Sequence, residues 1–298
     1  MQRRDFIGSG SALIALALMS NSASASAEPH SPAPTPRAIQ PITLKNIVIG
    51  AGEPKIIVST TASHSEAVKD FVQQQAKRPE PAVIELRLDQ LDNSDDVAAM
   101  VQLTRELYAI LPDKLLLVTF RTKAEGGNQA IDDQRYAALY HQLLTLGQMD
   151  LLDIEMYRGT PQVEQLIALA HQQGVHVILS SHDFQQTPSQ AEIISRLRQQ
   201  QAMGADILKI AAMPHDAGDV LRMMSATWEM AQRYAQRPLL TMSMGGMGAL
   251  SRLAGELTGS ALTFGMAGSA SAPGQLDVGD LSATLAMLHS SLSSEKPA

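Results

Sequence analysis

The sequence of 298 residues has no cysteine, and aromatic residues make up only 4% of it. Without cysteine the chain can form neither a disulfide bond nor a thiolate metal site. Basic residues are also outnumbered, with 23 lysines and arginines against 30 aspartates and glutamates, for a formal net charge of −7. A chain with no basic surplus and few aromatic side chains is a poor candidate for nucleic-acid binding. We therefore expect no nucleic acid among its partners.

The first residues lack an apolar run of membrane-spanning length, but they carry an export pattern. The run Ala12–Met19 is far shorter than the about 20 apolar residues of a transmembrane helix. Arg3 and Arg4 precede this run, and the small residues 22–27 follow it. A charged start, a short apolar middle and a small-residue end are typical of a secretory signal, and paired arginines favour the twin-arginine export machinery. We therefore predict a periplasmic protein without a membrane span.

The composition changes where this signal is expected to end. Residues 1–27 form the predicted signal peptide, with cleavage near Ala25 or Ala27. Residues 28–42 form a spacer rich in proline, serine and alanine, and its five prolines exclude a regular hydrogen-bonded element. No later stretch has the composition of a linker, so residues 43–298 are expected to be a single domain.

Short β-rich runs recur along this domain and alternate with segments of helical spacing at residues 133–146, 191–203 and 220–234. Eight such units predict an α/β fold, a parallel (β/α)8 TIM barrel, with an open doubly wound sheet as the alternative. Residues 43–50, before the first unit, would supply a hairpin that closes the barrel floor. The predicted strands are residues 56–60, 83–89, 115–121, 151–157, 175–183, 207–214, 239–245 and 261–267.

Each predicted strand is apolar at its start and polar near its end. In a TIM barrel the carboxyl ends of the strands carry the functional groups. Glu85 and Arg87 are two residues apart, which places both on the same face of one strand, and inside the barrel they must be paired and hydrogen-bonded. The charged residues near strand ends are Glu85, Arg87, Arg121, Glu155, His182 and Lys209.

Lys209 lies in the run ILKIAAMP, between apolar neighbours. Loss of solvent favours the neutral amine and lowers its pKa. A neutral amine can attack a ketone or an aldehyde and form an imine. The alternative is a buried lysine that only forms an ion pair with Glu85 or Glu155.

His182 ends the fifth predicted strand, and its ordinary pKa suits a carrier of protons during such chemistry. Glu125 lies four residues after Arg121 and is followed by two glycines, which allow a tight turn that aims its carboxylate back at the imidazole. The alternatives are a histidine that only bonds a loop and a solvated loop acid.

The last two strand–helix units carry further candidates. Arg252 lies near the start of the seventh predicted helix. Residues 268–275 follow the eighth strand and are small and polar, which suits either a closing lid or a phosphate cradle. His171 and His176 flank a turn, and no cluster of His, Asp and Glu has metal-ligand spacing, so we expect no metal.

Taken together, these motifs resemble those of the type I 3-dehydroquinate dehydratases. The matching pieces, in the family's order over residues 43–292, are GEPKIIVS, ELRLD, TFRTKAEGG, SSHDF, ILKIAAMP, SRLAGE, TFG and ASAPGQ. The resemblance implies a hydro-lyase that converts 3-dehydroquinate to 3-dehydroshikimate without a metal or an organic cofactor.

The resemblance also implies a role for each candidate. Lys209 resembles the imine-forming lysine, His182 the general acid/base and Glu125 the carboxylate that orients it. The residues that resemble the family's substrate-binding groups are Arg252 for the carboxylate, Glu85, Arg87 and Arg121 for the hydroxyls and their network, and Ser271 and Gln275 for the lid.

Two features depart from the family's pattern. The turn at residues 244–248, MGGMG, has few polar side chains to offer a substrate. The export signal is unusual because biosynthesis of shikimate is cytosolic, and it favours a catabolic role in which periplasmic quinate is the source of 3-dehydroquinate. Two rival functions are another imine-forming barrel lyase, such as a sugar-phosphate aldolase, and a periplasmic binding protein for quinate-like acids. The sequence leaves a homodimer open.

Overall fold

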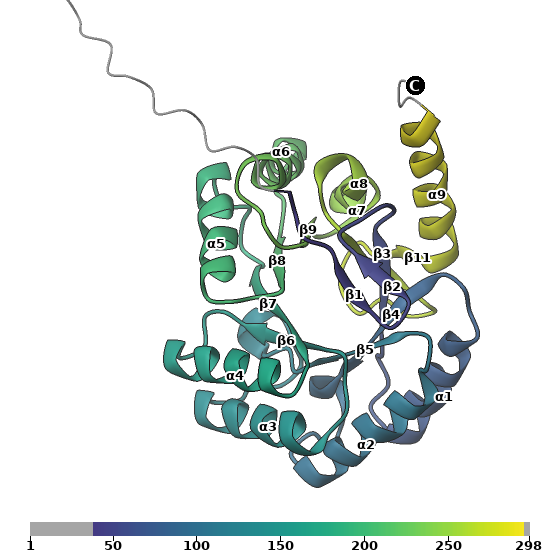
Figure 1. The fold of residues 1–298 in the computed structure, drawn as a ribbon, viewed down its shortest axis with the longest axis vertical. Coiled ribbons are helices and arrows are strands. Elements are labelled where there is room, and N and C mark those ends of the chain that lie inside the picture. The colour runs from purple at the N-terminus through teal and green to yellow at the C-terminus, as the bar shows by residue number, and fades with distance from the viewer. Residues whose placement is uncertain (1–37, 295–298) are drawn as a thin grey trace, which may run out of the picture. The chain divides into compact units, whose positions relative to one another are not determined.

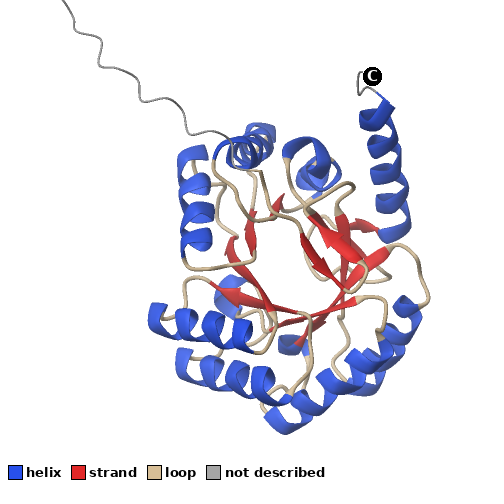
Figure 2. Cartoon of the chain, viewed as in Figure 1, coloured by secondary structure: helices blue, strands red, loops and turns tan. Residues whose placement is uncertain are grey.

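Eight parallel strands curl into a barrel in the computed structural model, which describes residues 38–294 (Figures 1 and 2). Each strand is followed by helical segments on the outside of the ring. The predicted (β/α)8 fold class is therefore confirmed. The strands are β3 (Lys55–Ser59), β4 (Pro81–Arg87), β5 (Leu115–Thr119), β6 (Leu151–Glu155), β7 (His176–Asp183), β8 (Ile207–Ala212), β9 (Leu239–Ser243) and β10 (Leu262–Met266).

The barrel closes between its last two strands. The hydrogen-bonded order runs from β10 through β3 and onward to β9, with the short β11 (Leu276–Asp277) added beside β10. A single parallel bridge joins Leu239 to Ser260, and the amide of Ala261 donates to the carbonyl of Leu239 at 2.7 Å. This seam makes the alternative of an open doubly wound sheet wrong.

Amphipathic helices cover the outer face of the barrel. The three helices expected from spacing are present as α3, α5 and α6, each within a few residues of its predicted bounds. Side chains of Asp96, Asp132, Ser189 and Asp216 cap helix starts by accepting a backbone N–H. The helices are α1 (Ser65–Ala76), α2 (Val97–Ile110), α3 (Asp133–Leu146), α4 (Thr160–Gln172), α5 (Gln190–Ala202), α6 (Ala217–Arg233), α7 (Ala249–Leu253), α8 (Gly255–Thr258) and α9 (Val278–Ser294), with 3-10 turns η1 (Leu88–Gln90), η2 (Lys123–Glu125) and η3 (Gly246–Gly248).

A hairpin of β1 (Ile42–Leu44) and β2 (Ile47–Ile49) lies across the floor of the barrel. Its Ile42 and Ile49 are buried among residues that point into the barrel, such as Ile57 and Leu115. Lys45, in the turn of the hairpin, anchors it by donating to the carbonyl oxygens of Leu111 and Lys114 at 2.8 and 2.7 Å. The predicted floor hairpin is therefore confirmed.

The alternation of side chains along β8 decides which residues face the interior. Leu208 and Ile210 pack in the layer between the strands and the helices, whereas Ile207 and Ala211 pack inside the barrel. Since side chains alternate along a strand, Lys209 points inward with Ile207 and Ala211. The apolar neighbours read from the sequence thus place this amine inside the barrel.

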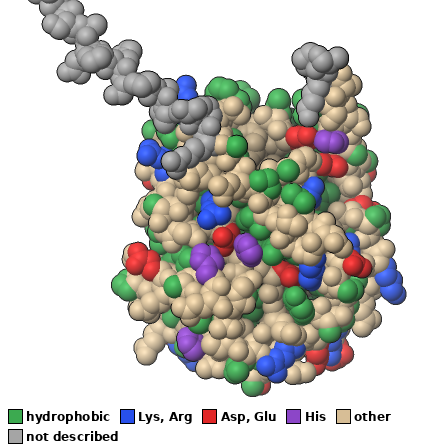
Figure 3. All heavy atoms as spheres, in the orientation of Figure 1, with side chains coloured by type: hydrophobic (Ala, Val, Ile, Leu, Met, Phe, Trp, Pro, Cys, Tyr) green, Lys and Arg blue, Asp and Glu red, His purple; other side chains and the backbone are tan. Residues whose placement is uncertain are grey.

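Side chains of both charge signs are scattered over the face shown in Figure 3, without a broad basic patch. Within residues 38–294, no helix has both the length and the apolar character needed to cross a membrane. The predicted signal peptide and most of the predicted spacer lie outside the described residues, so these predictions are not tested.

Candidate active site

One pocket opens among the carboxyl ends of the barrel strands and the loops that follow them. Its volume, counted together with its open mouth, is about 590 Å3. Apolar side chains, among them Phe184, Met242 and Phe264, form part of its wall. All nine site residues predicted from the sequence line it: Glu85, Arg87, Arg121, Glu125, His182, Lys209, Arg252, Ser271 and Gln275.

Lys209 presents a buried amine to this pocket. The residue is 3% exposed, and its Nζ lies 4.9 Å from the centre of the Phe264 ring. Its ion-pair partner is Asp153 of β6, with Nζ 2.7 Å from Oδ2, and not Glu85 or Glu155 as the sequence suggested. Burial lowers the pKa of Lys209, and the positive charge of Arg121 lowers it further, against the opposing effect of Asp153. Burial thus favours the neutral amine, which is the form that attacks a carbonyl carbon.

The main chain of Lys209 is held by a side chain from the outer layer. Gln200 of α5 is fully buried, and its amide oxygen accepts from the Lys209 N–H at 2.8 Å. Its amide nitrogen donates to the Lys209 carbonyl oxygen, also at 2.8 Å. These two bonds fix the position of the backbone from which the amine extends.

His182 and Glu125 form a buried pair at the mouth of the pocket. Nδ1 of His182 lies 2.8 Å from Oε2 of Glu125. Burial raises the pKa of Glu125 to about 8. Burial, with the cations Arg121 and Lys209, lowers the pKa of His182 well below its usual range. When Glu125 is ionised, its carboxylate can hold the Nδ1–H of His182, which leaves Nε2 free to accept a proton.

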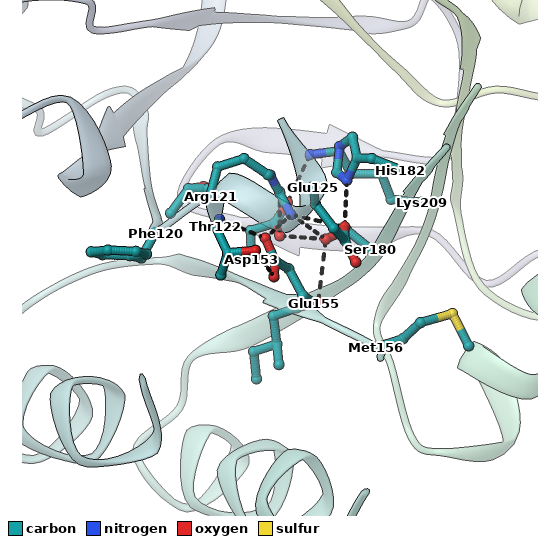
Figure 4. Close-up of polar contacts among 12 residues, drawn as sticks. Phe120, Arg121, Thr122, Glu125, Asp153, Glu155, Met156, Ser180, His182 and Lys209 are labelled. Atoms are coloured by element: carbon teal, nitrogen blue, oxygen red, sulfur yellow. Dashed lines mark hydrogen bonds and ion pairs between the residues drawn. The ribbon is translucent and has the colours of Figure 1, made fainter. Parts of the chain in front are cut away.

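Arg121 is the centre of a buried ionic network that joins these groups (Figure 4). Its Nη2 donates to Oδ1 of Asp153 at 2.6 Å, and its Nη1 donates to Oε1 of Glu155 at 3.1 Å. Nη1 also donates to the hydroxyl of Ser180 at 3.0 Å and lies 3.5 Å from Glu125. The guanidinium of Arg121 is already shared among several acceptors, so few of its donors are free for a ligand. Its main effect is to hold these side chains in place.

Glu85 and Arg87 both face the pocket, but they do not pair with one another. Arg87 donates two hydrogen bonds of 2.8 Å to the carboxylate of Asp89. Glu85 accepts from the hydroxyls of Ser59 and Thr119. Each buried charge on β4 is thus satisfied by its own neighbours, as burial requires.

Arg252 is a buried cation without a counter-charge. It is 2% exposed, and no carboxylate of the described residues lies within 4.0 Å of it. Its hydrogen bonds go to the sulfur of Met242 and to the carbonyl of Pro273, and its Nε has no partner. Burial lowers its pKa to about 10, so the guanidinium remains charged at neutral pH. A ligand carboxylate would satisfy both the charge and the free donor.

The loop of residues 268–275 covers one side of the pocket. Ser271 and Gln275 are joined by two hydrogen bonds of 2.9 Å. The amide of Gly245 donates to the carbonyl of Pro273 at 3.1 Å, and a Cβ on Gly274 would lie 2.0 Å from the Gly245 carbonyl. The turn at residues 244–248, which has few polar side chains, therefore supports this loop through its backbone.

The site contains three groups that the sequence analysis did not single out: Asp153, Ser180 and Gln200. Asp153 alternates with Glu155 in LLDIE, and this period-two spacing was a signal that it also points inward. Among residues 38–294, no three His, Asp or Glu side chains lie together in a way that could hold a metal ion.

Comparison with known proteins identifies the family. The model of the type I 3-dehydroquinase family matches residues 56–292. The 3-dehydroquinate dehydratase of Shigella dysenteriae is 44% identical over 248 residues, which cover 83% of this chain and 98% of that protein. The enzyme of that name from Enterococcus faecalis is 46% identical over 241 residues, covering 80% of this chain and 94% of its own length.

A solved structure supports the same assignment. The type I 3-dehydroquinate dehydratase of Clostridium difficile, crystallised with covalently modified comenic acid, superimposes with a TM-score of 0.82 at 40% identity. The match covers 85% of this chain and 99% of that one. The pocket described above thus lies in a barrel that the relatives share over nearly their whole length. The chain belongs to the type I 3-dehydroquinate dehydratase family, whose members are hydro-lyases.

Proposed function

We propose that this hydro-lyase dehydrates 3-dehydroquinate through an imine on Lys209, with His182 as the carrier of protons. One observation carries the proposal: a buried amine, a histidine–carboxylate pair and an arginine without a counter-ion line the same pocket. Arg252 would hold the substrate carboxylate, which fixes the ring relative to Lys209. Capture of comenic acid in covalently modified form by the Clostridium difficile relative supports covalent chemistry in this family.

The first half of the reaction forms the imine. The neutral amine of Lys209 attacks the carbonyl carbon, and one of the two amine protons passes to the carbonyl oxygen, which becomes a hydroxyl. His182 donates a further proton to this hydroxyl, which leaves as water, while the nitrogen keeps one hydrogen and a positive charge. The resulting iminium draws electrons from the neighbouring carbon, as an electron sink must.

The second half removes the substrate hydroxyl. His182 takes a proton from the carbon next to the iminium, and the C–H electron pair forms an enamine. The enamine electrons then expel the hydroxyl on the following carbon, which leaves as water with the proton returned by His182. Water finally hydrolyses the conjugated iminium, which releases 3-dehydroshikimate and the amine and returns to His182 the proton that it donated in the first half. Glu125 keeps the imidazole aimed at both leaving groups through its bond to Nδ1.

The test is chemical trapping during turnover. Sodium borohydride reduces an imine to a stable amine, so it should inactivate the enzyme only when 3-dehydroquinate is present. Turnover itself is followed by the ultraviolet absorbance of the enone product. An enzyme that turns over 3-dehydroquinate and keeps full activity after borohydride treatment would contradict the imine.

We further propose that the enzyme is exported and serves periplasmic breakdown of quinate. The paired Arg3 and Arg4, the short apolar run and the small-residue stretch that ends at Ala27 support this proposal. In that setting an oxidation of quinate would supply the ketone. Fractionation of cells that express the full chain, with activity assayed in periplasm and cytoplasm, tests the location.

A further inference from the structure

We propose that Asp153 is the counter-ion that keeps the Lys209 imine protonated, so that the imine remains an electron sink during turnover. The inference deepens the imine mechanism proposed above and rests on it. Oδ2 of Asp153 lies 2.7 Å from Nζ of Lys209. Among the described residues, no other carboxylate lies within 4.0 Å of this nitrogen. Asp153 therefore contacts the atom on which the positive charge of the iminium would reside.

Two donors prevent this carboxylate from turning away. Its other oxygen, Oδ1, accepts from Nη2 of Arg121 and from Oγ of Ser180, both at 2.6 Å (Figure 4). The Asp153 side chain is fully buried, so solvent does not compete for either oxygen. With Oδ1 occupied on both sides, Oδ2 is the oxygen left to face Lys209.

The other acids near the pocket are already engaged elsewhere. Glu85 of β4 accepts from two hydroxyls, and Glu125 of η2 pairs with His182 of β7. Glu155 of β6 accepts from the amide and the hydroxyl of Thr122, each at 2.8 Å. The cations Arg121, which follows β5, Arg87 of β4 and Arg252 of α7 add positive charge around the pocket. Of these groups Asp153 is the one placed to offset a positive nitrogen on Lys209.

The reaction requires such an offset. An imine nitrogen that loses its proton becomes neutral and withdraws electrons far less strongly from the neighbouring carbon. A buried cation without a partner is strongly disfavoured, so a lone iminium beside Arg121 would release its proton to solvent or to His182. A carboxylate in contact favours the charged form by about one to three pKa units.

The discriminating variant is Asp153→Asn, which preserves the shape of the side chain and removes its charge. Borohydride reduces neutral and protonated imines, whereas cyanoborohydride reduces the protonated form. The yield of cyanoborohydride adduct, divided by the yield of borohydride adduct, therefore reports protonation of the imine. Both yields are read by intact-protein mass spectrometry after mixing with 3-dehydroquinate at pH 6 and at pH 8.

We expect this ratio in Asp153→Asn to fall about tenfold or more below the wild-type ratio at pH 8, and to recover at pH 6. The kcat of the variant should fall in parallel as the pH rises. Glu155→Gln is the matched control, since it removes a buried carboxylate from the same strand and from Arg121 without touching Lys209. It should keep the wild-type ratio.

If Asp153→Asn shows the wild-type ratio at both pH values, Asp153 is not the counter-ion of the imine. A fall of equal size in Glu155→Gln would overturn the proposal as well, since the effect would then be one of general charge. Absence of any adduct in the wild-type enzyme is a different result, because it contradicts the imine mechanism on which this proposal rests.

A milder variant covers the case in which Asp153→Asn does not fold, as judged by its circular dichroism. Ser180→Ala keeps the carboxylate but removes one of the two donors to Oδ1. Its ratio at pH 8 should fall in the same direction by a smaller factor. An unchanged ratio in this folded variant would speak against the proposal.

Discussion

Nη2 of Arg252 lies 3.2 Å from the carbonyl oxygen of Pro273 and donates to it. This bond joins α7 to the loop of residues 268–275, which also lines the pocket. Arg252 is therefore tied to the loop that covers one side of the pocket, while its Nε has no partner in the described part of the chain. Binding of a carboxylate at Arg252 would order the arginine and the covering loop together.

Arg252→Ala should raise KM by about tenfold to several hundredfold, because paired charge-assisted hydrogen bonds worth about 1.5–3 kcal/mol would be lost. Arg252→Lys should recover only part of this loss, since a lysine cannot donate in the same forked geometry. Initial rates over a range of 3-dehydroquinate concentrations give KM. The exposed Arg233→Ala on α6 is the control and should leave KM unchanged. An unchanged KM in Arg252→Ala would place the carboxylate elsewhere.

The pH dependence of the rate should report the His182–Glu125 pair. Burial raises the pKa of Glu125 to about 8, and below that pH the pair carries the proton that His182 first donates, so kcat/KM should fall as the pH rises above 8. Glu125→Gln leaves a histidine whose pKa burial and nearby cations hold low, so the falling limb should move to lower pH. Its kcat should fall by about 10²-fold or more.

Asp183→Asn is the control for this profile. Asp183 follows His182 in the sequence, but its carboxylate accepts from the loop amides of Gln185 and Gln186. We expect the pH dependence of kcat/KM in this variant to be that of the wild type. A Glu125→Gln enzyme whose limb stays where the wild type has it would show that the pair does not control the proton.

Gln200 should affect both stability and turnover. Gln200→Leu leaves the N–H and the C=O of Lys209 buried without their partners, at a cost of about 1–3 kcal/mol for each group. The melting temperature should fall, and kcat should fall more than KM changes, since the amine is displaced and Arg252 is not. Gln199→Leu makes the same substitution at an exposed position of α5 and should change neither quantity. Equal behaviour of the two variants would contradict the role given to Gln200.

Much of the fold could be predicted because its signals are local. Short β-rich runs that begin apolar and end polar predicted all eight barrel strands, and helical spacing predicted α3, α5 and α6. The floor hairpin was also predicted from residues 43–50. Closure of the barrel at the Leu239–Ser260 bridge could not be read from the sequence, since it depends on how the twist of eight strands adds up.

The sequence predicted which residues line the candidate site and the contact between Glu125 and His182, but it did not predict the partner of Lys209. All nine predicted residues line the pocket, since strand ends of a barrel converge on one face. The partner of Lys209 was misjudged, because Asp153, Glu85 and Glu155 are equally plausible as inward acids until the distances are known. Gln200 lies on the apolar face of α5 with Leu197. Its spacing does not show whether the side chain only packs there or also forms hydrogen bonds to the backbone of the neighbouring strand.

Export should depend on the two arginines at the start of the chain. Arg3→Lys combined with Arg4→Lys should leave active precursor in the cytoplasm, because the twin-arginine machinery recognises the arginine side chains. Fractionation followed by activity assay measures this, with Arg37→Lys as a control for loss of an arginine outside the signal. Normal export of the double variant would remove the assigned route, though not the enzymatic activity.

The central claim is that Lys209 forms the imine, and the most direct measurement is the position of the reduced adduct. Borohydride added during turnover should attach the ligand to one residue, and peptide mass spectrometry should place the added mass on Lys209. Lys209→Ala should yield neither the adduct nor the enone, whereas His182→Ala should still form adduct slowly while turnover falls by about 10⁴-fold. An adduct on any other lysine, or full activity in Lys209→Ala, would contradict the account.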